Sequence, residues 1–506
     1  MVVCQYLRVG AIALISLSLL ACSSSFLNLA PASATTPYYG APGMPAIDTG
    51  SSDFAVASDP SMPVAIATPK LDASRTYSLP ELINIAQMTS PATRAAWERA
   101  RQAAAATGLA EAAYLPILSA DVLAGFAVTS NTAPGFEALF IDIPSGTITT
   151  KGVQAVPSLA IQWLLFDFGG RDAALATAQQ LSFAANVGFN GTHQRLIYDV
   201  ANAYYQNAAS RAQTRINRES LENARLVQTA AEARLEQGIA TTMEVAQAKQ
   251  QVAQAEFDLS EASGQERSTY AALLGAMGLS PTLSIKVQDI AGKPLPRHVP
   301  GDLDRLIVAS LQRRADVQAS FAQLKASEQG ILAAEADFLP KVALTGSANA
   351  VLGTYTVSDS RFGAHESLNV HQPNAALLLG VTLPIFDGGM RDAQLDSARA
   401  NAAASAYDFS RLQTTAAQEI VVAYDVLRTS LSGYAAATAL VTAALTNNEA
   451  ALEYYQTGLG TLQDLSVTQT GLLKARYAQA QARSNAFSAA ATLAFATGTL
   501  TSAHGL

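Results

Sequence analysis

The pattern in this sequence that could bind a ligand most directly is a glycine-containing phrase that occurs twice. It reads LFDFGGRDA over residues 165–173 and IFDGGMRDA over residues 385–393. A glycine-rich turn ahead of a helix can bind phosphate through backbone N–H groups and the helix dipole. Nucleotide-binding loops also carry a basic or hydroxyl side chain at a fixed spacing after the glycines, and neither copy has one. The phrase therefore predicts a turn that shapes the fold rather than a phosphate site.

The other residues with catalytic or metal-binding chemistry do not form a recognisable site. His365, Glu366 and His371 fall in a predicted loop and do not have the HExxH spacing of zinc hydrolases. Both cysteines, Cys4 and Cys22, lie at the N-terminus, so the rest of the chain has no disulfide framework and no cysteine metal site. The net charge of -8 argues against a nucleic-acid partner. We therefore expect no enzyme activity, no cofactor and no metal.

The N-terminal residues 1–21 are typical of an export signal. Arg8 supplies a minimal basic start, and the apolar stretch 11–20 is too short to span a bilayer. The segment ends in Leu-Leu-Ala-Cys, which resembles the signal of bacterial lipoproteins and would make Cys22 the acylated first residue of the mature chain. The alternative is ordinary cleavage after Ala34, which would discard Cys22.

Residues 22–75 predict a tether, because they are rich in Ser, Pro, Ala and Gly and have little periodicity. Ser23, rather than aspartate, follows the cysteine, which by resemblance to lipoproteins favours the outer membrane. Further along, no apolar run approaches the roughly 18 residues that a transmembrane helix needs. If the protein sits in a membrane, helices do not place it there.

The repeated phrase is one of several matches between two halves of the chain. Its copies begin 220 residues apart (385 − 165), and Gly238 and Gly458 match at the same offset. This self-similarity predicts two structural repeats, 79–278 and 303–500, joined by a linker over 279–302 that glycine and proline mark. The chain is thus expected to be an internally duplicated protomer.

Each repeat follows the same plan of one helix, two strands, one very long helix and a last helix. In the first repeat these are helix 79–114, strands 117–128 and 156–167, helix 170–238 and helix 241–276. In the second they are helix 303–337, strands 341–351 and 376–386, helix 390–457 and helix 462–498. Loops over 129–154 and 352–374 are expected to join the strands of each pair.

Periodicity supports this plan. In the first strand, Leu118 and Val122 alternate with Ser119 and Asp121, which is the pattern of a half-buried strand. The long helices contain no proline and would each extend about 100 Å. Their coiled-coil spacing is readable at five positions of the first long helix: Leu221, Ala224, Gln228, Ala231 and Leu235.

The predicted strands also indicate an assembly. A tilted strand of roughly 11 residues can cross a bilayer. Lipid tolerates no unpaired strand edge, so membrane strands close into barrels of at least about eight. Four strands cannot do this alone, whereas three copies of the chain would supply twelve. We therefore expect an α+β membrane protein that forms a homotrimer.

The sequence resembles the outer membrane factor, or TolC-like, family of export ducts. The resemblance covers about 79–500 and rests on the duplicated plan and the repeated phrase, with LPELINIAQMTSPATRAAWERA, EAAYLPIL, ARLEQGIATTMEVAQAKQ and YYQTGLGTLQDLSVTQ. It implies a twelve-stranded β-barrel in the outer membrane, continued by a twelve-helix α-barrel in the periplasm. It also implies two partners, a periplasmic adaptor (membrane fusion) protein and an inner-membrane pump.

The resemblance assigns the turns between paired helices to the periplasmic tips. Residues implied to form the tips and contact the adaptor or a neighbouring copy are Gly238, Thr241, Thr242, Gly458, Thr461 and Leu465. Glu244 and Asp464 fall where family members carry carboxylates at the tunnel mouth. The alternative is that both are solvated acids that stabilise helix starts. Gly460 and Val467 depart from the family pattern, which implies a gate held differently or more loosely.

The repeated phrase would be the hinge between a membrane strand and a tunnel helix. Its hinge residues are Phe166, Gly169 and Gly170 in the first copy and Phe386, Gly388 and Gly389 in the second. The glycines would permit the sharp redirection, and the aromatic residues would lie at the membrane interface or pack under the helix start. Arg171 and Arg391 could pair with a carboxylate or with lipid headgroups, and the sequence leaves both open.

The function that follows is an outer membrane exit duct of a tripartite efflux system that passes small molecules. A duct for type I protein secretion would share this fold, and a non-conducting periplasmic scaffold is the third alternative. The strand alternation argues against the scaffold.

Overall fold

The computed structural model describes residues 34, 54, 60–63, 69, 71–138, 141–296, 301–361 and 363–502. The chain divides into two units, Met1–Ile66 and Ala67–Leu506, and the second contains every helix and strand discussed below. The expected signal peptide and Cys22 lie outside the described residues, as does most of the expected tether.

The first repeat contains four helices, α2 (Leu79–Thr89), α3 (Pro91–Ala112), α4 (Gly170–Glu236) and α5 (Thr242–Ala276). The single helix expected over 79–114 is therefore wrong, because it is divided at Ser90. Pro91 pushes the preceding residue into extended geometry, and Ser90 has φ −62° and ψ 123°. Pro91 was therefore a local signal for this break.

The second repeat contains α6 (Leu303–Arg313), α7 (Ala315–Ala336), α8 (Met390–Thr457) and α9 (Leu462–Ala496). Its first helix is divided too, at Arg314, where no proline signals a break. The Arg314 backbone is extended, and its buried guanidinium forms ion pairs at 2.7 Å with Asp316 and with Glu419 of α8. The single helix expected over 303–337 is therefore wrong, and a tertiary ion pair lies at the break.

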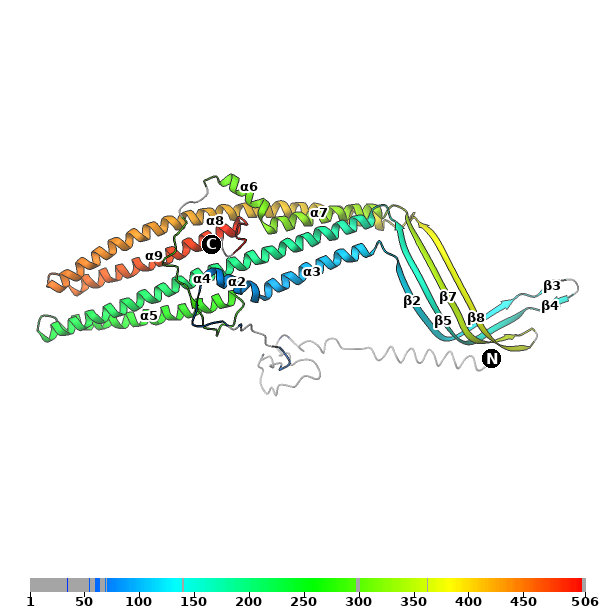
Figure 1. Ribbon diagram of the computed structural model, residues 1–506, viewed down its shortest axis with the longest axis horizontal. Helices are drawn as coiled ribbons and strands as arrows, with labels where there is room; N and C mark the ends of the chain where they lie inside the picture. The colour runs from blue at the N-terminus through cyan, green and yellow to red at the C-terminus, as the bar shows by residue number, and fades with distance from the viewer. Residues whose placement is uncertain are drawn as a thin grey trace. The chain divides into compact units, whose positions relative to one another are not determined.

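The long helices form two antiparallel pairs, α4 with α5 and α8 with α9, and α4 also packs along α9 (Figure 1). The shorter helices α3 and α7 extend the bundle toward the strands, with α7 packing against both α4 and α8. Leu221, Ala224 and Ala231 of the predicted coiled-coil spacing are buried. Small alanine side chains let the helix backbones approach closely, so the interior of these pairs is thin.

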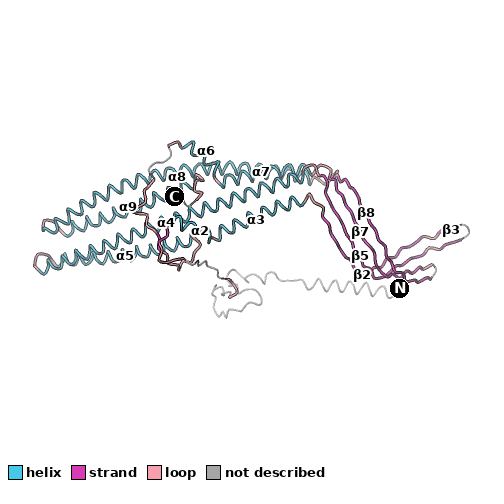
Figure 2. Tube along the Cα trace, in the orientation of Figure 1, coloured by secondary structure: helices cyan, strands magenta, loops and turns pink. Residues whose placement is uncertain are grey.

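Four long strands form one antiparallel sheet in the order β2-β5-β7-β8 (Figure 2). They are β2 (Ile117–Ala133), β5 (Gly146–Phe166), β7 (Lys341–Asp359) and β8 (Ala364–Thr382). The strands are longer than expected, and the loops predicted over 129–154 and 352–374 are mostly strand. His365, Glu366 and His371 accordingly lie in β8 and not in a loop. The short strands β3 (Phe136–Ala138) and β4 (Ile141–Ile143) continue the first hairpin.

The two repeats meet in the middle of the sheet, where β5 pairs with β7. Within the described chain, β2 and β8 each pair along one side only, so they are its two edges. None of the described helices combines the length and the apolar character needed to cross a membrane.

The segment after α5 was expected to be a linker, and its residues 286–293 pair with β1 (Thr76–Tyr77) and bind side chains of α4 and α9. Its strand β6 (Lys286–Val287) pairs in parallel with β1. Arg211 of α4 donates to the Val287 carbonyl at 2.7 Å, and Arg483 of α9 donates to the Ala291 and Lys293 carbonyls at 2.8 and 2.6 Å. Side chains from both helix pairs thus bind the backbone of one strap.

Candidate functional site: the helix tips and the strand-to-helix hinges

The turns at the far ends of the long helices are closed by glycine. Gly238 follows α4 with φ 75°, and Gly458 follows α8 with φ 81°, a conformation that side chains with a Cβ rarely adopt. The next amides close each helix end, since Ile239 N donates to Arg234 O and Leu459 N to Tyr454 O, both at 2.9 Å. Each glycine therefore ends one helix and lets the chain return along it.

The helices that leave these turns start with threonine caps. The Thr241 hydroxyl accepts from Glu244 N, and the Thr461 hydroxyl accepts from Asp464 N, each at 3.2 Å. Only the second turn forms a reciprocal capping box, because the Asp464 carboxylate accepts from Thr461 N at 3.2 Å and from the Thr461 hydroxyl at 2.6 Å. These hydrogen bonds lower the pKa of Asp464. The structure thus gives Asp464 a helix-capping contact, and its place at a tunnel mouth stays a prediction.

The two tips pack against each other through a small apolar cluster. Its buried members are Val227, Ala231, Val245, Ala248, Tyr455, Leu462 and Leu465. Leu465 is 0% exposed, so the expectation that it contacts a partner is wrong. It lies one turn after the exposed Thr461, on the side of α9 that faces the first helix pair. Thr241, Thr242 and Thr461 are exposed.

Arg234 links the tips, and the sequence analysis did not identify it. Its Nη1 donates to the Tyr455 carbonyl at 2.9 Å, and its guanidinium lies 4.9 Å from the centroid of the Tyr455 ring. Tyr455 is only 4% exposed, and burial raises the pKa of its hydroxyl. The position of Arg234 in the last turn of α4 was a usable signal, because cations are favoured at helix C-termini.

Gly460 fits this arrangement as a residue without a side chain. A Cβ built on it would lie 3.0 Å from the Tyr454 Cβ and 3.2 Å from Tyr455 N. The second turn therefore packs tightly against the end of its own helix. The positive charge that joins the two tips is that of Arg234, which belongs to the first helix pair. Val467 is exposed on α9 and takes no part in this contact.

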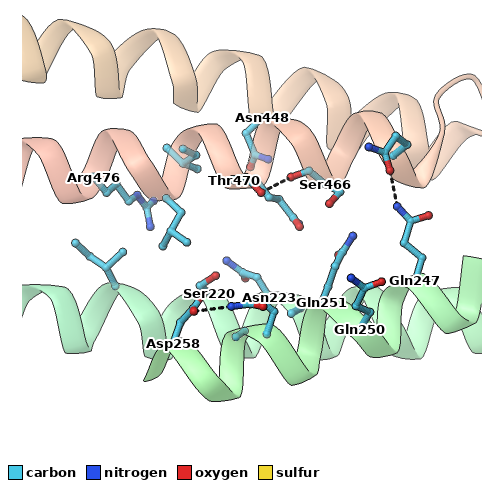
Figure 3. A pocket seen from close by; sticks show the side chains of 18 of the residues that line it. Ser220, Asn223, Gln247, Gln250, Gln251, Asp258, Asn448, Ser466, Thr470 and Arg476 are labelled. Atoms are coloured by element: carbon cyan, nitrogen blue, oxygen red, sulfur yellow. Dashed lines mark hydrogen bonds between the residues drawn. The ribbon is translucent and has the colours of Figure 1, made fainter. Parts of the chain in front are cut away.

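A polar groove of about 810 Å³ lies behind the tips, between the two helix pairs, and α5 and α9 supply most of its lining. Figure 3 shows Gln247 and Gln250 of α5 facing Ser466 and Thr470 of α9 across it. At the tip end Gln247 donates to the Gln463 amide oxygen, which joins the two walls. Amides and hydroxyls dominate the lining, with Asp258 and Arg476 as its charged members, so the groove can form hydrogen bonds.

The first copy of the repeated phrase forms a tightly connected hinge at the other end of α4. Gly169 has φ 97°, and α4 begins at Gly170. The Asp167 carboxylate accepts from Arg171 N at 2.8 Å and lies 3.4 Å from Arg171 Nε. Arg171 also donates to the Leu164 carbonyl at 2.7 Å, at the end of β5. Arg171 therefore pairs with a carboxylate of its own phrase.

Neighbouring aromatic residues join this hinge to the end of α3. The Trp163 indole donates to the Tyr114 carbonyl at 2.8 Å, and the Tyr114 hydroxyl donates to Asp172. The Arg171 guanidinium lies 4.8 Å from the centroid of the Tyr114 ring. Phe166 and Phe168 pack edge to face with centroids 4.6 Å apart. Trp163 thus fastens β5 to the helical part of the chain.

The second copy has the same aspartate–arginine ion pair, with fewer other contacts around it. Gly388 and Gly389 have φ 71° and 89°, and α8 begins at Met390. The Asp387 carboxylate accepts from Arg391 Nε at 2.6 Å and from Arg391 N at 3.3 Å. Phe386 is 88% exposed. In both copies the carboxylate that accepts from the start of the helix belongs to the aspartate before the glycines, Asp167 or Asp387.

Comparison with known proteins identifies this arrangement. The sequence profile of a family described as outer membrane efflux protein matches residues 82–279 and 306–499, which are the two repeats. The chain belongs to this family. It is an outer membrane efflux channel, and membership of this family confirms the expectation that it is not an enzyme.

Individual relatives agree with this assignment. The chain is 28% identical over 413 residues to Protein CyaE of Bordetella pertussis, with 81% of each chain covered. It is 30% identical over 335 residues to the pyoverdine export outer membrane protein OpmQ of Pseudomonas aeruginosa, covering 64% of this chain and 65% of OpmQ.

Solved structures support the fold. VceC from Vibrio cholerae superposes with a TM-score of 0.65 at 23% identity, covering 83% of this chain and 96% of VceC. The CmeC channel of Campylobacter jejuni superposes with a TM-score of 0.66 at 18% identity, covering 88% and 94%. The expected α+β fold of long helix pairs and four antiparallel strands is confirmed.

Proposed function

We propose that this channel is the outer membrane exit duct of a tripartite efflux system and works as a homotrimer. The observation that carries the proposal is the single sheet with two edges, β2 and β8, joined to a bundle of very long helices. Three such sheets close into a twelve-stranded barrel when β2 of one copy pairs with β8 of the next. Closure satisfies the edge N–H and carbonyl groups, which lipid cannot do.

One face of the sheet fits contact with lipid. Leu118, Val122 and Leu377 are between 68% and 74% exposed in the single chain, although all three are apolar. Buried against acyl chains, each such side chain contributes roughly 1.5–3 kcal/mol. The exposed Phe166 and Phe386 at the hinges suit an aromatic girdle at the periplasmic interface.

The helix tips are the proposed contact with a periplasmic adaptor, which connects the duct to an inner-membrane pump. Thr241, Thr242 and Thr461 are exposed beside the glycine turns, where a partner can contact them. Glu244 and Asp464 would surround the tunnel mouth in three copies and favour cations there. The energy for transport would come from the pump, since the duct itself is passive.

The proposed cargo is small molecules, such as toxic compounds. Relatives include proteins named for pyoverdine export and for toluene efflux. Deletion of the gene should raise the sensitivity of the cell to such compounds, and a wild-type copy should restore resistance. Unchanged sensitivity together with loss of a secreted protein would instead favour the alternative of type I protein secretion.

The mature chain is also proposed to carry a lipid anchor on Cys22, with residues 22–75 as its tether. Cys22→Ser should abolish incorporation of radiolabelled palmitate and leave an uncleaved precursor. Labelling that persists, or cleavage after Ala34, would contradict the anchor.

The trimer is tested by chemical crosslinking of the mature protein in membranes. The proposal predicts a crosslinked product of three times the monomer mass that survives mild detergent. A purely monomeric product would contradict the shared barrel.

A further inference from the structure

A straight row of polar side chains crosses the apolar part of the sheet. Strand pairing places Asp121 of β2 opposite Ser158 of β5, Ser158 opposite Asn349 of β7, and Asn349 opposite Asn374 of β8. Residues directly opposite one another in antiparallel strands point to the same face. All four strands therefore present a polar group at one level and on one side.

The row lies on the face opposite the apolar one. Side chains alternate between the two faces of a strand, so Val122 and Leu159 point away from Asp121 and Ser158. The next row on the polar face is small, with Ser119 opposite Ala160. On its other side the next row contains Leu123 opposite Val156, so the polar row lies between a small row and an apolar one.

Asp121 is a lone charge in this region. It is the single ionisable residue of β2. The ionisable residues of β5, β7 and β8 lie toward the strand ends or in the half of the sheet farther from the helices. Among the residues that the structure describes, the Asp121 carboxylate has no ion-pair or hydrogen-bond partner, and the side chain is exposed. An unpaired carboxylate is costly in lipid, so this face must meet water.

We propose that this row is a cation-attracting belt on the inner wall of the proposed barrel, separate from the carboxylates at the tips. The proposal rests on the proposed trimer, in which the row closes into a ring with three aspartates. Serine hydroxyls and asparagine amides fill the rest of the ring, so no basic group offsets the charge. The ligands that it favours are polyvalent cations and cationic solutes that enter or leave by the barrel.

The expected size of the effect follows from the dimensions of such a barrel. Twelve strands about 4.8 Å apart and tilted by about 40° give a radius of roughly 12 Å. This is close to the screening length of about 10 Å at 0.1 M salt, which grows to about 30 Å at 0.01 M and shrinks to about 3 Å at 1 M. The belt should therefore act strongly at low salt and vanish at high salt.

The test is block of the reconstituted full-length channel in a planar bilayer by hexaamminecobalt(III). At 10 mM KCl, Asp121→Asn should raise the half-blocking concentration about three- to tenfold when the ion is added on the outer side. Block from the tip side should not change. Asp121→Glu, which keeps the charge, should behave like the wild type, and Asp464→Asn should alter only block from the tip side.

Two results would overturn the belt. One is equal outer-side block of Asp121→Asn and the wild type at 10 mM KCl, and the other is a difference that persists undiminished at 1 M. If Asp121→Asn does not insert, Asp121→Ser serves as the neutral variant, since serine already occupies the row. A wild-type chain that inserts without any conductance would refute the duct function itself, whereas normal conductance without the block difference refutes only the belt.

Discussion

The two strand-to-helix hinges have nearly the same sequence and different surroundings. In the first, Arg171 reaches three backbone carbonyls, those of Ala113, Leu164 and Leu165, in addition to Asp167. In the second, the described contacts of Arg391 are with Asp387 and the Phe338 ring. The first hinge follows β5, which has a neighbouring strand on both sides, and the second follows the edge strand β8.

This difference indicates which part of the fold is complete within one chain. Both hinge arginines are 12% exposed, but their apolar neighbours differ. Phe166 of the first hinge is 52% exposed, whereas Ile385 and Phe386 of the second are 92% and 88% exposed. In the proposed trimer the next copy would cover these side chains. The acid–arginine pair is thus the part that both hinges share, and the remaining contacts depend on the position of the strand in the sheet.

The largest expected effect in this comparison is that of Arg171→Ala. The substitution leaves the Asp167 carboxylate without its ion pair and three carbonyls without a charged donor, which should lower the free energy of unfolding by about 3 kcal/mol. Thermal or urea denaturation of the purified protein, followed by circular dichroism, measures this. A loss below about 1 kcal/mol would show that the hinge does not need its arginine.

At the tips, the first repeat again supplies the arginine, but here it holds the second repeat. Arg234→Ala removes the hydrogen bond and the ring contact to Tyr455, worth about 1.5 kcal/mol together, and should raise the open probability of the channel about tenfold. Arg225→Ala is the matched control, because Arg225 pairs with Glu256 within the first helix pair. Equal single-channel records for both variants would contradict a link between the tips.

The matched change at the second hinge, Arg391→Ala, should cost less than Arg171→Ala. Arg391 has one carboxylate partner and one aromatic contact, so we expect the free energy of unfolding to fall by about 1 kcal/mol in the same denaturation experiment. Equal losses of stability in the two arginine variants would contradict this difference between the hinges, because the additional carbonyl contacts of Arg171 would then add no stability.

The smallest expected effect concerns the N-terminal cap of α9. Hydrogen bonds from Thr461 lower the pKa of Asp464, so its ionised form stabilises the helix start above the unfolded value of about 3.9. This stabilisation is lost as the pH falls through the lower folded value. Asp464→Asn should therefore speed amide hydrogen exchange over residues 462–465 at pH 6, with no such difference once the carboxyl is protonated. A difference that does not depend on pH would contradict the cap.

Several elements followed from sequence because their signals are local. The strand starting at Ile117 shows apolar alternation, and Gly238 and Gly458 mark turns by their backbone freedom. The same strand continues to Ala133 through a polar stretch from Thr129 to Thr132. There the backbone pairing with β5 maintains the strand without any alternation of side chains, so the pattern gave no sign of it.

Other features depended on contacts between distant residues. Arg314, at the break between α6 and α7, pairs with Glu419 on another helix, and Arg234 meets Tyr455 across 221 residues of sequence. The family resemblance implied that Leu465 contacts the adaptor or a neighbouring copy, yet the opposite tip buries it. Local patterns located the hinges and the tips, whereas the pairs that hold them together required the packed helices.

The central claim is that the chain forms a duct through the outer membrane, and channel recording tests it most directly. Full-length wild-type protein and Arg234→Ala are each reconstituted in a planar bilayer under one voltage. The account predicts discrete current steps for both, with openings that are more frequent for Arg234→Ala and a similar fully open conductance. An inserted, folded protein that passes no current in either form would contradict the duct.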